Sequence, residues 1–177
     1  ARVMRKFGML FQGGALFDSL TVWENVAFAL MYRDGVGRGE AKRLAIETLA
    51  KVRLGASAAD LRPAELSGGM QKRVALARAI IAKPDLIFFD EPTTGLDPIT
   101  ADAVNNLIVE QVKALGAAAI TITHDMASVR KIADEVAMLH EGRIIWRGPV
   151  SKLDASGSHH IDQFVHGRAE GPIQPAI

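Results

Sequence analysis

Two hydrophobic periods alternate along the chain, and each predicts a different kind of element. Short apolar runs at Phe7–Phe11, Leu86–Asp90 and Ala118–Thr123 are bounded by Gly, Pro or polar residues, which is typical of buried strands. Between these runs, apolar residues recur at the spacing of one helix face. Strands that alternate with helices predict an α/β domain with a mainly parallel sheet. The helices are expected at residues 21–32, 38–52, 67–82, 98–115 and 125–133.

The order of these elements predicts how the chain is divided. Residues 20–80 contain only predicted helices, so we expect them to form a separate helical lobe. Residues 1–19 and 81–150 hold the predicted strands and would form the sheet-containing core. Residues 151–177 are expected to be a C-terminal tail with one weak helix near Ile161–Val165.

A hairpin is expected before that tail. Val136–His140 and Arg143–Arg147 are apolar runs separated by Glu141-Gly142, a pair typical of a tight turn. The charged residues of the 38–52 helix, such as Glu47 and Lys51, stand four apart and favour a solvated face over a binding patch.

Composition and charge exclude several classes of function. With 177 residues, 49% of them hydrophobic, the chain is long enough to bury the core of one domain. A formal net charge of +1 and the lack of a basic run give no case for nucleic acid binding. The absence of cysteine excludes a disulfide scaffold and a cysteine-ligated zinc site. No apolar run approaches the roughly 18 residues that a membrane-spanning helix needs, so any service to a membrane is expected to act through partners.

A Gly-containing turn at Ser67-Gly68-Gly69 predicts an anion site. The first turn of a helix presents unpaired backbone N–H groups and a partial positive charge. Two glycines let an anion approach that backbone closely, and the Ser67 hydroxyl adds a donor. Taken alone, the motif is more typical of an ordinary capped helix. The carboxylate pair farther along the chain favours the anion site.

That pair is Asp90-Glu91, which ends an apolar strand. In open α/β sheets, ligands bind beyond the carboxyl ends of the strands. An aspartate there can hold Mg²⁺, directly or through water. A glutamate beside it can polarise an attacking water. The competing interpretation, a strand-end aspartate that caps the next turn, does not require two consecutive carboxylates after four apolar residues.

Three further residues are candidates for the site only because the Ser67-Gly68-Gly69 turn and the Asp90-Glu91 pair are present. His124 follows another predicted strand and can bond a terminal phosphate at the same edge of the sheet. Gln12 ends the first predicted strand, and Asp97 follows Gly95-Leu96. The paired histidines His159-His160 lack acidic or cysteine partners at ligand spacing, so a metal site is not expected there.

One expected element is missing from the sequence. An anion site, a Mg²⁺ ligand and a water-activating carboxylate together suit the hydrolysis of a nucleoside triphosphate. The phosphate-binding loop of many enzymes with that activity follows the pattern G-x-x-x-x-G-K-[ST], and the chain contains no Gly-Lys dipeptide. The nearest candidate, Gly35–Gly39, has neither the spacing nor the lysine. The chain also starts without Met and almost at once enters a predicted strand. We therefore expect a piece of an ATPase that does not bind ATP by itself.

Taken together, these motifs resemble those of the ATP-binding cassette (ABC) ATPases, the motor subunits of ABC transporters, over essentially the whole chain. The resemblance implies an incomplete P-loop NTPase domain, with a RecA-like core and an inserted helical lobe. It also assigns roles: Gln12 as the Q-loop glutamine, Leu66–Gln71 as the signature motif, Leu86–Asp90 as Walker B, Glu91 as the catalytic glutamate, Gly95-Leu96-Asp97 as the D-loop and His124 as the switch histidine. The adenine-stacking loop and Walker A of the family lie upstream of the Q-loop and have no counterpart here.

A narrower resemblance is to the ATPases of Mce-type lipid transport systems, which maintain outer-membrane lipid asymmetry. It rests on Gly14–Val22, on Met70 in the signature, and on the tail segments Gln163–Gly167 and Gly171–Ile173. The resemblance implies that the protein moves phospholipid between bacterial membranes. The implied partners are a transmembrane permease, an Mce-domain lipid-binding protein and a small regulatory subunit. The implied location is cytoplasmic, on the inner face of the inner membrane.

In this family two subunits pair head to tail and share each nucleotide. The resemblance implies that Glu91 and His124, with Gln12, act on the nucleotide of their own subunit. Mg²⁺ would be held by Asp90 and Gln12. The residues that bind nucleotide would be Ser67, Gly68, Gly69, Gln71 and Asp97, the signature residues contacting the ATP of a second, identical subunit.

Two other interpretations remain open from the sequence. The chain could be a non-catalytic binding or dimerisation module, because loss of the front segment would leave sheet edges unpaired and apolar surface bare. It could also belong to a soluble ABC ATPase of DNA repair or translation. Those proteins carry coiled-coil insertions or tandem cassettes, whereas this chain has one signature and no heptad run.

Overall fold

The computed structural model describes residues 6–174, which divide into two compact units at the boundary between His124 and Asp125. The predicted boundaries of the helical lobe, at 19/20 and 80/81, do not coincide with this division and remain predictions. Within the described residues no helix is both long and apolar enough to span a bilayer.

The first unit is built on a three-stranded parallel sheet. Its strands are β1 (Phe7–Leu10), β2 (Leu86–Asp90) and β3 (Ala118–Ile122), in the order β1-β2-β3. Leu10 pairs with Phe89, and Asp90 pairs with Ile122. Because the strands are parallel and in this register, Gln12, Asp90 and His124 all follow strand ends at the same edge of the sheet. The predicted strands and the predicted parallel sheet are confirmed.

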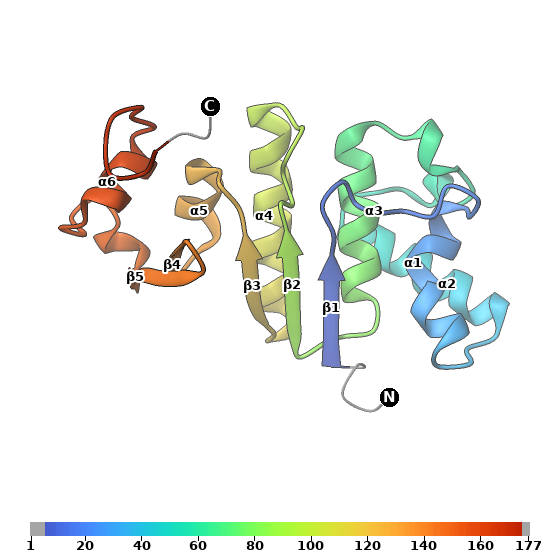
Figure 1. Cartoon of the computed structure of the whole chain (residues 1–177). Coiled ribbons are helices and arrows are strands. Elements are labelled where there is room, and N and C mark those ends of the chain that lie inside the picture. Colours follow the sequence, from blue (N-terminus) through green and yellow to red (C-terminus); the bar gives the residue numbers. More distant parts are fainter. Residues whose placement is uncertain (1–5, 175–177) are drawn as a thin grey trace. The chain divides into compact units, whose positions relative to one another are not determined.

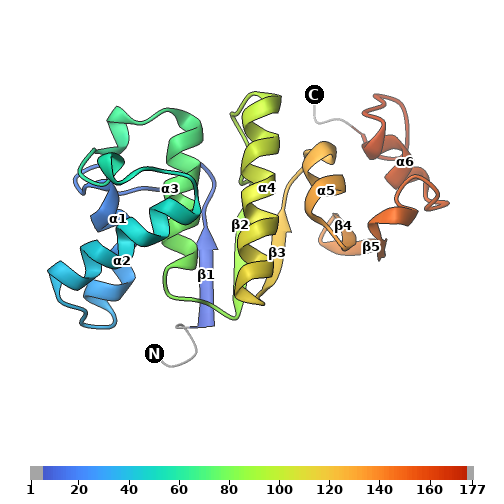
Figure 2. The ribbon, with the colours of Figure 1, turned by 180° about the vertical axis from the view of Figure 1, so that it is seen from behind.

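Four helices accompany this sheet, and two 3₁₀ turns precede the third helix (Figure 1). Helix α3 contacts β1 and also α1, α2 and α4, so it lies between the sheet and the first two helices. Figure 2 shows α4 over one face of the sheet. The elements are α1 (Val22–Tyr32), α2 (Arg38–Lys51), the turns Ala56–Ala58 and Pro63–Glu65, α3 (Gly68–Ile80) and α4 (Pro98–Leu115).

One hydrophobic core joins the helices to the sheet. Alternate strand residues, Leu10, Ile87 and Phe89, are fully or almost fully buried, as strand periodicity requires. They share a continuous cluster with residues of α1 to α4. The opposite face of the sheet is apolar but exposed, since Met9 is 42% and Ile122 is 64% accessible. Figure 1 views this uncovered face within the first unit.

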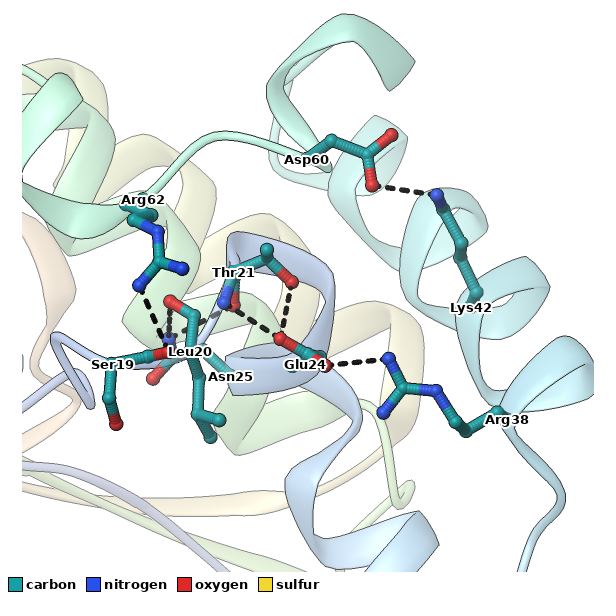
Figure 3. Close-up of polar contacts among 9 residues, drawn as sticks. All are labelled: Ser19, Leu20, Thr21, Glu24, Asn25, Arg38, Lys42, Asp60 and Arg62. Carbon is teal, nitrogen blue, oxygen red and sulfur yellow. Dashed lines mark hydrogen bonds and ion pairs between the residues drawn. The ribbon is translucent and has the colours of Figure 1, made fainter.

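Side-chain hydrogen bonds fix the start of α1 (Figure 3). The Thr21 N–H and hydroxyl both donate to one carboxylate oxygen of Glu24, at 2.9 and 2.8 Å, and Arg38 donates to the other at 2.8 Å. The fully buried Asn25 donates to the carbonyls of Leu20 and Thr21. A capping box of this kind satisfies donors that the first helical turn leaves unpaired. The helix predicted from Thr21 therefore starts where the sequence places it.

The second unit contains the predicted hairpin and a small core. Strands β4 (Glu135–His140) and β5 (Arg143–Pro149) pair antiparallel after α5 (Met126–Ile132). The predicted tail contains the expected helix, observed as α6 (His159–Val165), and it is more ordered than expected before that helix, where a 3₁₀ turn spans Val150–Lys152. Its Leu153 and Ile161 are buried against Val129 of α5. These apolar side chains make the segment part of the unit.

Candidate active site

Glu91 and His124 meet at the carboxyl edge of the sheet. The His124 Nδ1 atom lies 2.7 Å from a Glu91 carboxylate oxygen. The other carboxylate oxygen accepts hydrogen bonds from the hydroxyls of Thr94, at 2.8 Å, and Thr123, at 3.3 Å. The Glu91 side chain is only 14% exposed, whereas that of His124 is 71% exposed. Two of the three residues predicted to be catalytic, Glu91 and His124, are thus in direct contact, whereas no such contact joins them to the third, Gln12, among the hydrogen bonds of the described residues.

The backbone of Glu91 is held in an uncommon conformation. Its φ is +46°, in the left-handed region that residues with a Cβ atom rarely adopt. The Glu91 N–H donates to the Ile122 carbonyl at 2.9 Å, and the Lys72 ammonium donates to the Glu91 carbonyl at 3.2 Å. Such strain persists only where the surrounding structure enforces it, and it concentrates at functional sites.

These contacts keep Glu91 ionised. Partial burial by itself would raise the pKa of the Glu91 carboxyl group. Hydrogen bonds from His124 and Thr94 outweigh that effect and lower the pKa below its ordinary value. An ionised carboxylate at a strand end can accept a proton from water, which is the property that a general base needs.

Asp90 and Gln12 follow neighbouring strands at the same edge. Asp90 ends β2, and Gln12 lies two positions beyond Leu10, the partner of Phe89. Gln12 is exposed and belongs to a turn closed by a hydrogen bond from the Gly14 N–H to the Phe11 carbonyl, 2.9 Å long. Carboxylate and amide oxygens are ligands that suit Mg²⁺, so both side chains fit the predicted metal site.

The Ser67-Gly68-Gly69 turn opens α3 as predicted. The Ser67 hydroxyl accepts a hydrogen bond from the Met70 N–H at 3.3 Å, and Ser67 is the N-cap. A Cβ atom on Gly69 would lie 2.7 Å from the Thr100 Cγ2 atom, closer than atoms can pack. A Cβ atom on Gly68 would meet only Leu96, at 3.6 Å. Close packing of α3 against the start of α4 therefore requires glycine at position 69.

Gln71 and Asp97 make hydrogen bonds within their own segments. The Gln71 amide donates to the carbonyls of Pro63 and Leu66, at 3.0 and 3.3 Å, and so ties the preceding turn to α3. The Asp97 carboxylate accepts from the backbone N–H groups of Ile99 and Thr100 and caps α4. Their predicted contacts to nucleotide remain predictions.

Lys72 is a site residue that sequence reasoning missed. Only 4% of its surface is exposed, although it carries a charge, and its ammonium contacts the backbone of Glu91. A signal was present in the pattern: Lys72 stands at helical spacing from Gly69 and Leu76, both near the buried face of α3. Charged residues are rarely buried without a partner.

The other histidines form no metal centre in the part of the chain described here. No group of three or more His, Cys, Asp or Glu side chains gathers with metal-ligand geometry among residues 6–174. The rings of His140 and His160 do approach each other, with centroids 5.5 Å apart.

A cleft of about 400 Å³ lies elsewhere in the first unit. It is formed where α2, α3 and α4 end, and Lys51, Arg53 and Lys83 contribute to its lining. Cations at helix C-termini offset the negative end of the helix dipole, which accounts for their presence there. None of the residues predicted to act on nucleotide lines this cleft.

Sequence comparison identifies relatives over nearly the whole chain. A family model described as "ABC transporter" matches residues 1–94. The chain is 41% identical over 171 residues to the Escherichia coli intermembrane phospholipid transport system ATP-binding protein MlaF, covering 97% of this chain and 63% of that protein. It is 38% identical to the Arabidopsis thaliana chloroplastic protein TRIGALACTOSYLDIACYLGLYCEROL 3, covering 96% of this chain and 53% of that protein. The chain thus spans between half and two thirds of the length of these relatives.

Structural comparison agrees with the sequence. The dimeric structure of an ATP-binding cassette in a post-hydrolysis state, bound to ADP and Pi, matches with a TM-score of 0.74 and 32% identity, covering 84% of this chain and 65% of that one. The cbiO1 structure from Clostridium perfringens, part of an ABC transporter complex, matches with a TM-score of 0.76 and 30% identity, covering 87% of this chain and 61% of that one. The family match over more than half of the chain, together with these relatives, shows that the chain belongs to the ABC transporter ATPase family.

Proposed function

We propose that the chain is part of the ATP-hydrolysing motor subunit of a transporter that moves phospholipid between bacterial membranes. The observation that carries the proposal is the contact between Glu91 and His124 at the carboxyl edge of the sheet, 2.7 Å long. An ionised glutamate held there can activate water for attack on a terminal phosphate. The position agrees with the general rule that parallel sheets bind ligands at this edge.

The other predicted residues supply the remaining parts of the reaction. Asp90 and Gln12 would hold Mg²⁺, which neutralises charge on the phosphates when it is bound. His124 would bond the terminal phosphate. Since its Nδ1 atom is engaged by Glu91, that bond requires the ring to turn or to use its other nitrogen. The turn at Ser67–Gly69, of which Ser67 and Gly68 are exposed, would close over the ATP of a second subunit, and Gln71 and Asp97 would border the same nucleotide.

The relatives support lipid as the cargo. The Escherichia coli relative is named for intermembrane phospholipid transport. The likeness covers almost all of this chain, including the segment after Gln12 and the C-terminal unit. By this proposal the protein works as a homodimer with a transmembrane permease, an Mce-domain lipid-binding protein and a small regulatory subunit. It would sit on the cytoplasmic face of the bacterial inner membrane.

The test is Glu91→Gln in a complete ATPase, meaning a protein that joins this sequence to a phosphate-binding loop. Loss of the base is expected to lower steady-state hydrolysis by a factor of about 10² to 10⁴, while ATP still binds and the dimer still closes. Glu110→Gln is the matched control, because Glu110 is exposed on α4 and pairs with Arg53. Hydrolysis by Glu91→Gln near the wild-type rate would refute the role of Glu91.

The chain alone is expected not to bind ATP stoichiometrically. Its sequence holds no G-x-x-x-x-G-K-[ST] pattern, so no loop is present to wrap the phosphates with backbone N–H groups. Isothermal titration of the chain with Mg-ATP should give no saturable heat. Micromolar affinity would contradict this expectation and would point to a different phosphate site.

A further inference from the structure

Lys72 is a buried cation whose ammonium donates a hydrogen bond to a backbone carbonyl. Its side chain lies in the second turn of α3 with 4% of its surface exposed. Its ammonium donates to the backbone carbonyl of Glu91 at 3.2 Å. An ammonium group taken out of water loses strong solvation, so a position such as this needs a compensating interaction. The carbonyl of Glu91 and the nearby carboxylates supply it.

The carbonyl that Lys72 engages belongs to the strained peptide. Glu91 has a φ of +46°, and its N–H is fixed by the Ile122 carbonyl at 2.9 Å. The two bonds hold the residue from opposite sides, one from β3 and one from α3. Because the direction of the Glu91 side chain depends on this backbone conformation, the two bonds also determine whether the carboxylate reaches His124.

Lys72 also connects two parts of the site that lie apart in the sequence. It stands on the helix that begins at Ser67-Gly68-Gly69, while Glu91 follows β2. Gly69 is packed so tightly against Thr100 that no Cβ atom fits, so this end of α3 has little freedom to shift. Because the start of α3 is held in this way, any movement of the signature turn, meaning Ser67-Gly68-Gly69, would carry Lys72 with it and would change the distance between the Lys72 ammonium and the Glu91 carbonyl.

We propose that Lys72 is a positioning residue for ATP hydrolysis: it holds the Glu91 peptide in its left-handed conformation and couples it to the helix that carries the signature turn. The proposal rests on the function proposed above, and it assigns Lys72 no contact with nucleotide or water. When the signature turn closes on the nucleotide of a partner subunit, the movement would be transmitted through the Lys72 side chain to the Glu91 carboxylate of its own subunit.

Charge neutralisation alone is the competing explanation. Burial lowers the pKa of Lys72, and Glu91 and Asp90 oppose that effect by favouring the ammonium form. A role limited to charge would be kept by any cation nearby and would not depend on the hydrogen bond to the carbonyl. The exchange rate of the Glu91 backbone N–H separates the two explanations, because it reports the peptide itself.

The first experiment measures hydrogen exchange in the 177-residue chain by NMR, without nucleotide. In Lys72→Met, exchange of the Glu91 N–H is expected to accelerate about ten-fold relative to the Leu107 N–H in α4. Gln111→Met is the matched control, because Gln111 is 5% exposed and its side chain donates to the Lys51 carbonyl at 3.1 Å. This variant should leave the ratio of the two exchange rates as in wild type.

An unchanged ratio in Lys72→Met, or the same change in both variants, would overturn the proposal. If Lys72→Met does not fold, Lys72→Gln takes its place, since the glutamine side chain is uncharged and one bond shorter than that of lysine. The wild-type chain gives a check that needs no substitution. The ammonium protons of Lys72 should exchange slowly and show a scalar coupling to the Glu91 carbonyl carbon, and absence of that signal would also overturn the proposal.

The second experiment compares kcat with KM in the complete ATPase. Lys72→Met is expected to lower kcat about ten-fold with KM for ATP unchanged, because Lys72 positions the base and does not bind nucleotide. Lys72→Arg, which keeps a charged donor, should recover most of kcat. A change in KM alone, or no recovery by arginine, contradicts the positioning role. If the wild-type ATPase hydrolyses no ATP, the proposed function fails, yet the exchange experiment still decides the contact.

Discussion

Glu91 shows how much of the site depends on single hydrogen bonds. Its carboxylate is bound by His124, Thr94 and Thr123, and its peptide is fixed by Ile122 and Lys72. Each bond alone is worth about 0.5 to 3 kcal/mol, with bonds to charged groups at the upper end. Together they favour one orientation of a carboxylate in a protein loop that follows a strand. This is the geometry in which a general base is ready before its substrate arrives.

The single imidazole ring of His124 contacts Glu91 and is also proposed to bond the terminal phosphate. In the structure its Nδ1 atom is bound to Glu91, and most of the side chain is exposed. A histidine that is accessible on one side and bound to the base on the other can respond to a phosphate placed against its free nitrogen. Because the same bond lowers the pKa of Glu91, release of His124 would shift that pKa upward. By the proposed function, the pair would couple phosphate contact at His124 to the protonation of Glu91.

At the scale of elements, α3 is the helix on which the site depends most. It contacts β1 and three other helices, and it carries both the signature turn and Lys72. Arg78, on the same helix, donates to the carbonyls of Gly14 and Ala15 at 2.6 and 2.8 Å. These carbonyls lie in the loop directly after Gln12. One helix therefore links the loop after Gln12, the strand-end carboxylates and the exposed signature turn.

The packing of α3 against α4 gives a prediction for the chain as it stands. Gly69→Ala should place a methyl group against the stiff, β-branched Thr100 side chain and make the protein less stable than Gly68→Ala by about 1 to 3 kcal/mol. Both variants gain similar helix propensity, so their difference isolates the clash. Urea denaturation of the two variants provides the measurement. Equal midpoints would show that α4 moves aside at no cost.

Helices and strands were predicted accurately from the sequence where a glycine or a proline marks their ends. Helix α4 begins at Pro98 and ends before Gly116, whose φ of +62° fits the left-handed cap expected of glycine. Strand β2 covers Leu86–Asp90 as predicted, because an apolar run this short between Pro84 and Pro92 favours a strand over a helix. By contrast, α3 ends at Ile80, two residues before the predicted end. No glycine or proline marks that position, and Lys83 takes the left-handed conformation instead.

Contacts between segments that are distant in the sequence could not be predicted from the sequence. The bond from Lys72 to Glu91 joins residues 19 positions apart, and it exists because α3 packs against β1, the strand next to β2. The core of the C-terminal unit includes Ile161, in the predicted helix, but also Leu153, an apolar residue between Lys152 and Asp154. Periodicity cannot distinguish such a residue from those of a solvated tail. The strand-end pair of Asp90 and Glu91 could be predicted because a strand and its last residues are adjacent in sequence.

At the scale of the whole molecule, the uncovered face of the sheet stands out. Parallel sheets are normally covered on both faces, yet Phe7, Met9, Ile120 and Ile122 are between 37% and 64% exposed. Strands β1 and β3 are the outer strands of the sheet in the first unit. An apolar face and free strand edges favour association of this chain. A binding or dimerisation module, the alternative left open by the sequence, would use such a surface, and it stays a prediction.

By the proposed function, each nucleotide site is shared between two subunits: one subunit would supply the base, and its partner would supply the signature turn. Two heterodimers of the complete ATPase separate this arrangement from a site within one subunit. In the first, Ser67→Arg and Glu91→Gln lie in the same subunit beside a wild-type partner. In the second, Ser67→Arg lies in one subunit and Glu91→Gln in the other. The hydrolysis rates of the two purified heterodimers are then compared under identical conditions.

If each nucleotide is shared, the first heterodimer has a defect in both sites, while the second keeps one site intact. The account therefore predicts that ATP hydrolysis is abolished when the two changes share a subunit and persists when they are split. Hydrolysis that persists in the first heterodimer and is lost in the second would place Ser67 and Glu91 in the same site and contradict the account.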